Sequence, residues 1–243
     1  MSLVHTNKNI WSVLANSKNV LEIRKTEWLI FWGAGGYKPT ADTLAYYTAS
    51  DNWVFKDIVG NRSVSYWGWA NFDANSKSVS IPRGWYMHFI NGTPTNWGTV
   101  SFWIRIDWDF NFILFSSDYD GNWYMFQVQD SWVSFDNLQW FNWTIGLSQR
   151  LQKNRWYNLV LTQDWSTTKL YIDWVYRGAV SANIIYYSFH NFWQYYAYRS
   201  YQFDWLASDI IFERYAWGDQ KVRDVYNSQK PVYVKKMGGG YTW

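Results

Sequence analysis

Residues 154–173 read Asn154-Arg155-Trp156-Tyr157-Asn158-Leu159-Val160-Leu161-Thr162-Gln163-Asp164-Trp165-Ser166-Thr167-Thr168-Lys169-Leu170-Tyr171-Ile172-Asp173. Two runs in this stretch, 156–162 and 169–173, are rich in aromatic, leucine and β-branched side chains. A polar segment separates them. Short runs of this kind between turn residues are typical of β-strands that are partly or wholly buried.

Similar runs recur along the chain, with Gly, Asn, Asp and Ser between them. They are residues 78–81, 100–106, 112–115, 123–128, 132–135 and 208–212. Many short strands spaced by about 8 to 15 residues predict an antiparallel sandwich rather than βαβ units. One helix is predicted at residues 219–226, with Asp219 as the N-cap and with Val222, Val225 and Tyr226 on one face.

The sequence divides into three zones. Residues 1–40 form a polar N-terminal extension that ends in a glycine-rich linker around Gly33-Ala34-Gly35-Gly36. Residues 41–230 form the β-domain, and residues 231–243 are a glycine-rich tail. Sandwiches of this length commonly fold as one domain.

Composition excludes several classes of function. The 243 residues include no Cys, so disulfides, thiolate catalysis and Cys-zinc sites are absent. The net charge is +3, and the Lys and Arg residues are scattered rather than clustered, which argues against nucleic-acid binding. Residues 1–30 lack a signal-peptide pattern, and the apolar stretch 28–32 is too short for membrane insertion.

Several of these segments resemble the laminin-G-like, or concanavalin A-like lectin, superfamily. Residues 100–105 resemble its "sFWik" strand, residues 154–173 its "nqWhhvalt" and "klYvDG" segments, and residues 203–212 its "fdGlIdDvriy" segment. Residues 57–61 resemble its early "D.sGN" loop. The resemblance covers about residues 43–228. It implies an all-β fold of two antiparallel sheets with jelly-roll connections, and it implies binding modules for glycans, proteins or calcium-dependent ligands.

Tryptophan is unusually frequent, with 21 residues, while Gly occurs only 15 times. Trp165, Trp174 and Trp205 each follow an Asp where the resemblance predicts Gly. Gly is favoured in such turns because it reaches positive φ without steric cost, whereas Trp would be strained and exposed there.

We therefore hypothesise that many of these Trp positions were encoded as Gly, through a UGA codon that some bacterial lineages read as glycine. Trp103 and Trp156 match aromatic positions of the superfamily and are expected to be core residues. The alternative is that all the Trp residues are genuine and many form a glycan-stacking surface.

No catalytic constellation is recognisable. A retaining glycosidase needs two carboxylates about 5–5.5 Å apart, which on a strand commonly appear as Glu-x-Asp-x-x-Glu. The only Glu residues are Glu22, Glu27 and Glu213, and none of them has this spacing. The pairs Asp107/Asp109 and Asp118/Asp120 fit hairpin ends and turns. The sequence therefore predicts that the protein is not an enzyme and needs no cofactor.

Two segments are candidate ligand sites. The loop 118–122 offers oxygen ligands for calcium from Asp118, Asp120 and Asn122, although it also fits a hairpin turn. The densest aromatic segment, 186–201, predicts a stacking or protein-contact patch, or else a hairpin with one face in the core. Its candidate ligand-binding residues are Tyr186, Tyr187, His190, Tyr195, Tyr196, Tyr198 and Tyr201.

The function predicted from the sequence is a non-catalytic recognition module that binds glycans or a protein partner at a surface. The main alternative is a structural or adhesive subunit of a surface appendage or phage tail, assembled through residues 1–40. A concanavalin A-like glycosidase is the second alternative. The expected location is extracellular, on a cell surface or on a virion.

Overall fold

The computed structural model describes the chain in segments. These are residues 2–6, 9–15, 19–22, 36–49, 55–60, 62–67, 70–73, 78–81, 86–90, 93–94, 96–106, 112–117, 124–129, 132–137, 141–143, 151–152, 154–181, 191–192 and 205–236. The chain separates into two compact units. One is Pro39–Val222, and the other combines Met1–Lys38 with Arg223–Trp243.

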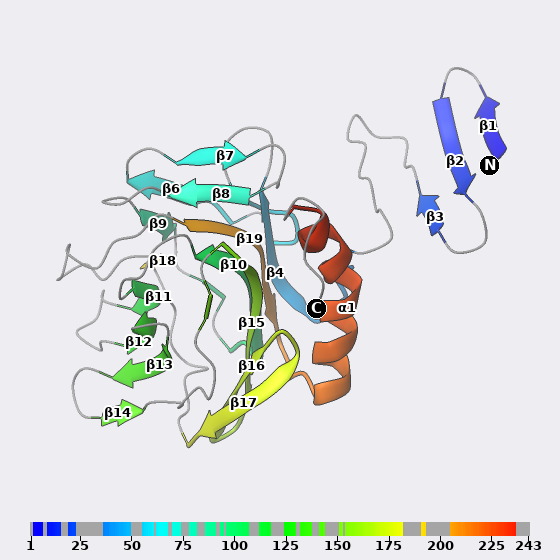
Figure 1. The fold of residues 1–243 in the computed structure, drawn as a ribbon. Helices are drawn as coiled ribbons and strands as arrows, with labels where there is room; N and C mark the ends of the chain where they lie inside the picture. The colour runs from blue at the N-terminus through cyan, green and yellow to red at the C-terminus, as the bar shows by residue number, and fades with distance from the viewer. Residues whose placement is uncertain are drawn as a thin grey trace. The chain divides into compact units, whose positions relative to one another are not determined.

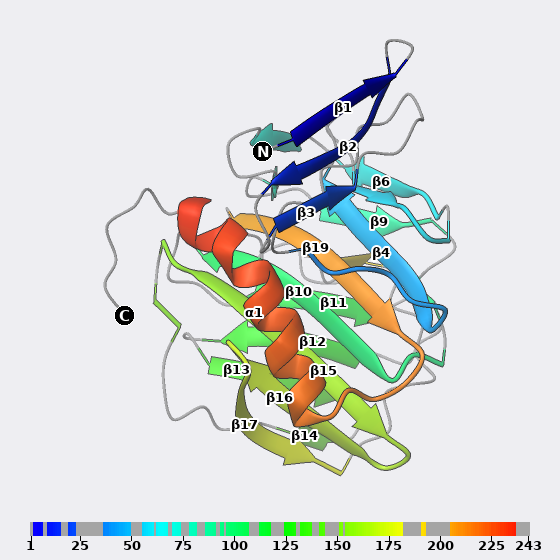
Figure 2. The ribbon, with the colours of Figure 1, turned by 90° about the vertical axis from the view of Figure 1, so that its right-hand side faces the viewer.

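The larger sheet belongs to the Pro39–Val222 unit. Its strands follow the order β17 (Val175–Val180), β16 (Thr167–Ile172), β15 (Trp156–Asp164), β10 (Thr99–Ile106), β19 (Trp205–Glu213), β4 (Thr43–Ala49) and β5 (Phe55–Asp57). In addition, β8 (Ser78–Ile81) pairs with β19 and with β7 (Asn71–Asp73). Figure 2 shows the strands of this sheet side by side.

A second sheet of the same unit faces the first. Its order is β14 (Phe141–Trp143), β13 (Trp132–Asn137), β12 (Tyr124–Gln129), β11 (Phe112–Ser117), β18 (Asn191–Phe192), β9 (Tyr86–Phe89) and β6 (Val64–Trp67). The described strand pairs of both sheets are antiparallel. The two sheets form separate layers (Figure 1), so the prediction of an all-β antiparallel sandwich is confirmed.

The hydrophobic core lies between these layers. Alternate residues of a strand point to the same face, and Val100, Phe102 and Ile104 of β10 are accordingly all buried in one core cluster. The Tyr47 ring of β4 lies 5.0 Å from the Phe89 ring of β9, which joins the two sheets. Each large apolar side chain buried in this way contributes about 1.5–3 kcal/mol to stability.

The central strand β15 is buried on both faces. Eight of its nine residues are buried, as is usual for a strand in the middle of a covered sheet. One of its two buried amides, Asn158, donates through Nδ2 to Ser101 Oγ at 3.2 Å. The predicted core residues Trp103 and Trp156 are each 2% exposed, which confirms them.

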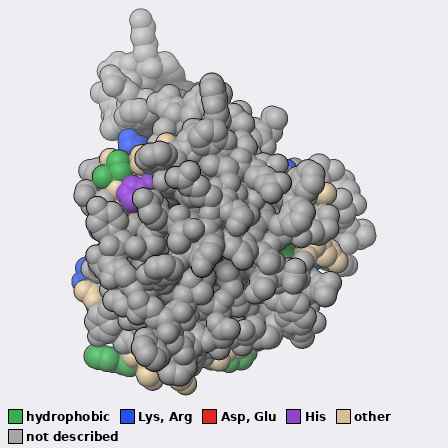
Figure 3. Space-filling view, turned by 90° about the vertical axis from the view of Figure 1, so that its left-hand side faces the viewer, with side chains coloured by type: hydrophobic (Ala, Val, Ile, Leu, Met, Phe, Trp, Pro, Cys, Tyr) green, Lys and Arg blue, Asp and Glu red, His purple; other side chains and the backbone are tan. Residues whose placement is uncertain are grey.

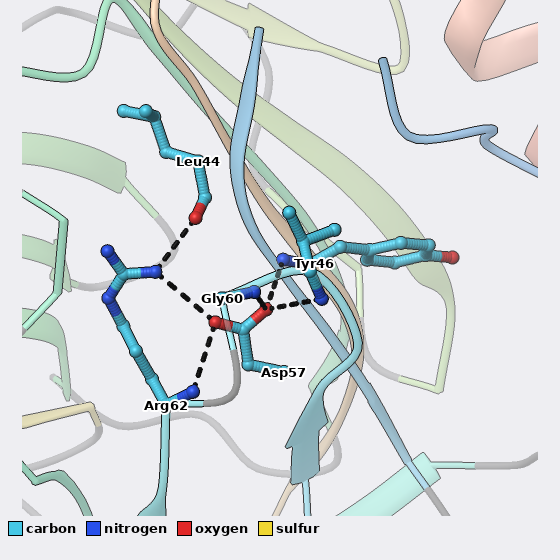
Figure 4. A network of polar contacts seen from close by, with 6 residues as sticks. Leu44, Tyr46, Asp57, Gly60 and Arg62 are labelled. Atoms are coloured by element: carbon cyan, nitrogen blue, oxygen red, sulfur yellow. Dashed lines mark hydrogen bonds and ion pairs between the residues drawn. The ribbon is translucent and has the colours of Figure 1, made fainter. Parts of the chain in front are cut away.

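A buried carboxylate organises the turn after β5 (Figure 4). Oδ1 of Asp57 accepts hydrogen bonds at 3.0 Å from three backbone N–H groups, those of Tyr46, Val59 and Gly60. Its Oδ2 lies 3.3 Å from Nη1 of Arg62, which also donates to the Leu44 carbonyl at 2.8 Å. This is the loop that resembles "D.sGN", and Asp57 holds it against β4.

Two of the three Trp residues for which the resemblance predicts Gly lie in turns with a left-handed backbone. Between β15 and β16, Trp165 has φ 26° and is 87% exposed. Between β16 and β17, Asp173 and Trp174 have φ values of 52° and 65°, as in a two-residue type I′ turn, which favours Asp-Gly. Trp205 differs from these two, because it is the first residue of β19.

The single described helix, α1, spans Asp219–Lys236 and crosses the boundary between the units. It extends beyond the predicted end at residue 226, and the predicted face of Val222, Val225 and Tyr226 is buried. Asp219 is not the N-cap, because the Val222 N–H donates to the Gly218 carbonyl at 3.1 Å, which makes Gly218 the cap residue.

The other unit contains a three-stranded antiparallel sheet in the order β1 (Ser2–Thr6), β2 (Asn9–Ala15) and β3 (Asn19–Glu22). The polar N-terminal extension is therefore partly β-structure. Within the described residues, no helix has the length and apolar character that a membrane span requires.

Candidate functional site

Both sites predicted from the sequence lie outside the described residues. The oxygen-ligand candidates Asp118, Asp120 and Asn122 lie in the segment that links β11 to β12, whose ends Ser117 and Tyr124 pair with each other. The aromatic candidates are Tyr186, Tyr187, His190, Tyr195, Tyr196, Tyr198 and Tyr201. Between them, only residues 191–192 are described, as strand β18. Both sites remain predictions.

The described residues bring charged and aromatic side chains together at the end of the larger sheet, around the turn between β16 and β17. We call this group the β17 turn site. It consists of Arg155, Tyr157, Asp173, Trp174, Tyr176 and Arg177.

Asp173 fixes the geometry of the turn. Its Oδ1 accepts a hydrogen bond from the Asn158 N–H at 2.9 Å, and its own N–H donates to the Asn158 carbonyl at 2.9 Å. Its Oδ2 accepts from Nη2 of Arg155 at 2.8 Å. The turn is therefore attached to β15 by three polar contacts, two of them to backbone groups.

Arg155 is held in place on two sides. Besides its ion pair with Asp173, its guanidinium lies 4.8 Å from the centroid of the Tyr157 ring, in a cation–π contact. The Arg155 side chain is 29% exposed. One side of the guanidinium is thus fixed by protein groups while part of it still faces solvent.

Arg177 occupies a β-bulge in the edge strand β17. Leu170 pairs with Gly178 and Tyr171 pairs with Tyr176, so Arg177 has no residue opposite it in β16. Its buried Nε has no hydrogen-bond partner among the described residues. Bulges commonly redirect a side chain at a sheet edge or beside a binding site.

Burial changes the acidity of two groups in the site. It raises the pKa of Asp173, an effect that the Asn158 N–H, Arg155 and Arg177 partly offset. Burial also raises the pKa of the Tyr157 hydroxyl. Both Arg155 and Arg177 act electrostatically on Asp173 and on Tyr157.

Exposed aromatic rings lie beside these charges. Tyr176 is 52% exposed, and its ring packs edge-on against Tyr171 at a centroid distance of 5.7 Å. Tyr171 Oη in turn donates to the Asp219 carboxylate at 2.6 Å. Trp174, at the tip of the turn, is 38% exposed.

The two parts of the site use opposite faces of the sheet. Tyr157 belongs to the core cluster between the sheets, whereas Tyr171 does not, and Tyr176 pairs directly opposite Tyr171. Arg155, which contacts the Tyr157 ring, therefore lies on the core side of the sheet end, whereas Tyr176 lies on the other side.

This arrangement can recognise a ligand but offers no described metal site. An exposed aromatic ring can stack on an apolar face of a ligand, and a guanidinium presents several N–H donors in a fixed plane. Among the described residues, no group of three or more His, Asp or Glu side chains could hold a metal ion.

Sequence reasoning did not single out this site. Arg155, Tyr157 and Asp173 were noted only as parts of the superfamily-like strands, and β17 was not predicted as a strand. The detectable signal was the Asp173-Trp174 pair, which fits a two-residue turn. The bulge at Arg177 leaves no recognisable pattern in the sequence.

On the face shown in Figure 3, which is the side of the smaller sheet, the described side chains lie at the margins. They include hydrophobic, basic and histidine groups.

No family model matches the chain. No curated protein matches it in sequence. Similarity is found instead among solved structures. Domain 4 of AbnA, an extracellular arabinanase of family GH43 from Geobacillus stearothermophilus solved with arabinotriose, is 15% identical with a TM-score of 0.63. The match covers 76% of this chain and 98% of that domain.

Two further structures share the fold. The binding domain of botulinum neurotoxin serotype D is 12% identical with a TM-score of 0.60, and the match covers 77% of this chain and 52% of that one. Trypanosoma rangeli sialidase in complex with sialic acid is 13% identical with a TM-score of 0.62, and the match covers 80% of this chain but 34% of that one. The chain thus spans about half or less of these two proteins, and at these identities the likeness concerns the fold.

Proposed function

We propose that this protein is a non-catalytic module that binds glycans through one end of its β-sandwich. The observation that carries the proposal is the match to 98% of a separate domain solved with arabinotriose. The match thus extends over almost all of that domain. Fold likeness alone does not fix a ligand, so the exposed groups of this chain decide what it can bind.

The β17 turn site supplies those groups. Sugar rings are bound by stacking on aromatic side chains and by hydrogen bonds to their hydroxyls. Tyr176, which is 52% exposed, offers a ring for such stacking. The predicted aromatic patch around Tyr195 and Tyr198 is a second candidate surface for the same function.

The three buried acidic side chains among the described residues have structural roles. The Glu213 carboxylate is 4% exposed and accepts a hydrogen bond from Thr43 Oγ1 at 2.6 Å. Asp57 and Asp173 are held by backbone N–H groups and arginines. This supports the non-catalytic assignment, and a recognition module of this kind would act outside the cell or at its surface.

The identity of Trp165 and Trp174 affects which aromatic residues are available to bind a glycan. We infer that Trp165 and Trp174 stand where the gene encodes glycine, because both have a left-handed backbone in a two-residue turn. Tyr176 is not open to this substitution and is therefore the aromatic residue that the proposal uses. The coding DNA decides the point, since UGG codons at 165, 174 and 205 would refute it.

The test of function is a glycan array probed with the full chain, followed by calorimetry on the best ligand. Tyr176→Ala should weaken binding by about 2- to 12-fold, since an aromatic stacking contact contributes about 0.5–1.5 kcal/mol. Tyr215→Ala is the matched control, because Tyr215 is 60% exposed and follows β19 at the opposite end of the sheet.

Other outcomes would refute the proposal. No bound glycan, together with a defined oligomer in size-exclusion chromatography and scattering, would favour the structural or adhesive subunit. Release of a shorter saccharide during incubation would favour a glycosidase. If Tyr195→Ala or Tyr198→Ala abolished binding and Tyr176→Ala did not, binding would belong to the aromatic segment instead.

A further inference from the structure

The face of the larger sheet that points away from the core carries an exposed ring on β17. Tyr171 and Tyr176 pair directly across β16 and β17, and their ring centroids are 5.7 Å apart. Tyr171 is 1% exposed, whereas Tyr176 is 52% exposed. The buried ring therefore packs against the edge of an aromatic side chain that is largely open to solvent.

The same buried tyrosine also holds an exposed carboxylate. Tyr171 Oη donates to Oδ1 of Asp219 at 2.6 Å, and Asp219, the first residue of α1, is exposed. A carboxylate can accept about four hydrogen bonds through its two oxygens. The contact with Tyr171 uses one of these positions, so the Asp219 carboxylate is oriented by the protein and can still accept hydrogen bonds from a ligand.

Tyr171 sets the spacing between the exposed ring and the carboxylate. It contacts Tyr176 through its ring and Asp219 through its hydroxyl, so these two groups are separated by little more than one tyrosine side chain. That separation is within the span of a mono- or disaccharide. Groups that are ordered before a ligand arrives lose little entropy when it binds.

We infer that Asp219 completes the glycan site at β17, where a neutral sugar stacks on Tyr176 and donates two adjacent hydroxyls to the Asp219 carboxylate. The inference rests on the proposed glycan-binding function and assigns the class of its ligand. Neighbouring hydroxyls on one sugar ring can donate to the two oxygens of a carboxylate. An acidic sugar in the same place would bring two negative charges together, which opposes binding.

The experiment first compares ligands by calorimetry on the full chain. The neutral probes are xylotetraose, cellotetraose and mannotetraose, and the acidic probe is tetragalacturonate, measured beside its methyl ester. We expect at least one neutral probe to bind, with an affinity that does not change with salt. Its 2,3-di-O-methyl derivative, which lacks the adjacent donors, should bind about tenfold more weakly or worse. Tighter binding of tetragalacturonate than of its ester would overturn the inference.

Variants of Asp219 locate the polar contact. Asp219→Asn should weaken binding of the neutral probe about tenfold, because hydrogen bonds to a charged acceptor contribute more than bonds to a neutral one. Asp219→Glu keeps the charge and should retain part of the affinity. Asp224→Asn is the matched control, since Asp224 is also an exposed acid on α1, and it should bind as the wild type does. Equal losses in Asp219→Asn and Asp224→Asn would overturn the inference.

Tyr171 is a positioning residue in this site, and a double-mutant cycle tests that role. Tyr171→Phe keeps the ring and removes the hydroxyl, so it should weaken binding severalfold by releasing the carboxylate. In an Asp219→Ala background, which has no carboxylate to position, the same substitution should cause no further loss. Losses that simply add would contradict the arrangement.

The inference and the proposed function can be told apart when they fail. Binding of any probe with an affinity that Asp219→Asn leaves unchanged would overturn the role of Asp219 and leave the glycan-binding module in place. Binding of tetragalacturonate alone would do the same. If none of the probes binds and the glycan array is also empty, both proposals are refuted.

Discussion

At the scale of single residues, backbone conformation separates the tryptophans into two groups. Trp103 and Trp156 are buried strand residues, and their position in aromatic β-runs made this predictable. Trp165 and Trp174 adopt positive φ in two-residue turns, where a side chain with a Cβ is strained. The Asp-Trp pairs predicted that strain correctly at two of three positions, and Trp205 differs because its strand starts directly after Asp204.

Replacing Trp174 with Gly should stabilise the protein. A left-handed conformation costs a non-glycine residue about 1–2 kcal/mol, and the greater freedom of Gly in the unfolded chain returns part of this gain. We expect a net increase of about 0.5–1 kcal/mol in the free energy of unfolding, measured in urea. Trp103→Gly is the control and should lose about 3–5 kcal/mol. A loss of stability in Trp174→Gly would show that the backbone at Trp174 is not strained.

The Asp57 network shows what sequence reasoning cannot supply at this scale. The resemblance predicted a loop at residues 57–61, and the structure has a turn there. However, no pattern indicates that one carboxylate oxygen accepts three backbone N–H groups at once. This arrangement depends on how β4 packs beside the loop, which the residues of the loop alone do not determine.

At the scale of secondary-structure elements, most of the longer strands of the sandwich were predictable, whereas β4 and several short strands were not. The runs at 78–81, 100–106, 112–115, 123–128, 132–135, 156–162, 169–173 and 208–212 all correspond to strands. Among the missed strands, β17 contains Arg177 and Gly178, which interrupt its apolar pattern. Helix α1 continues through Pro231, a residue that usually ends helices because it lacks an N–H donor.

Gly98 marks a junction between elements that the sequence does not reveal. Its N–H donates to the Glu213 carbonyl and its carbonyl accepts from the Gln163 N–H, each at 2.7 Å. A Cβ on Gly98 would lie 2.3 Å from backbone atoms of Tyr215 and Ala216. Backbone atoms cannot move aside as the end of a side chain can, so only glycine fits.

Gly98→Ala should therefore lower the free energy of unfolding by about 3 kcal/mol, measured by chemical denaturation. Gly218→Ala is the matched control, since nothing lies within 4 Å of its added Cβ, and it should cost less than about 1 kcal/mol. Similar effects of the two substitutions would show that β10 and the segment after β19 are not packed as described.

The contribution of Asp173, in the β16–β17 hairpin, to the free energy of unfolding should depend on pH. Burial raises the pKa of Asp173 above the ordinary value of 3.8, so the folded protein binds this proton more tightly than the unfolded chain does. The contribution to stability is then complete below about pH 3.8 and is lost as the pH rises through the raised pKa.

The free energy of unfolding of the wild type, relative to Asp173→Asn, should consequently fall between about pH 3 and pH 7. Urea titrations of both proteins across this range measure it. The fall should be larger in an Arg155→Gln background, because Arg155 lowers the pKa of Asp173. A wild-type advantage that grows towards neutral pH would contradict the raised pKa.

At the scale of the whole molecule, the sandwich and the N-terminal strands behave as separate structures. Strands β1–β3 pair only with one another among the described residues, and they belong to a different compact unit from the sandwich. Alternating apolar patterns predicted the sandwich. The same patterns gave no reliable assignment for residues 1–27, because a small sheet buries too little apolar surface to impose a clear alternation.

Deleting residues 1–22 should leave the unfolding of the sandwich unchanged. We expect the calorimetric Tm of the main transition to stay within about 2 °C, a change equivalent to less than about 1 kcal/mol for a domain of this size. Size-exclusion chromatography of the same variant tests assembly through the N-terminal extension. A drop of several degrees would show that the first three strands stabilise the sandwich.

The bulge at Arg177 also has a consequence for how copies of the molecule meet. Strand β17 ends the larger sheet, and a regular edge strand presents a row of unpaired N–H and C=O groups to any passing chain. A bulge that carries a cation interrupts this row, so the β17 strand of a second copy cannot pair regularly along it. Arg177 and its bulge therefore protect the protein against edge-to-edge aggregation.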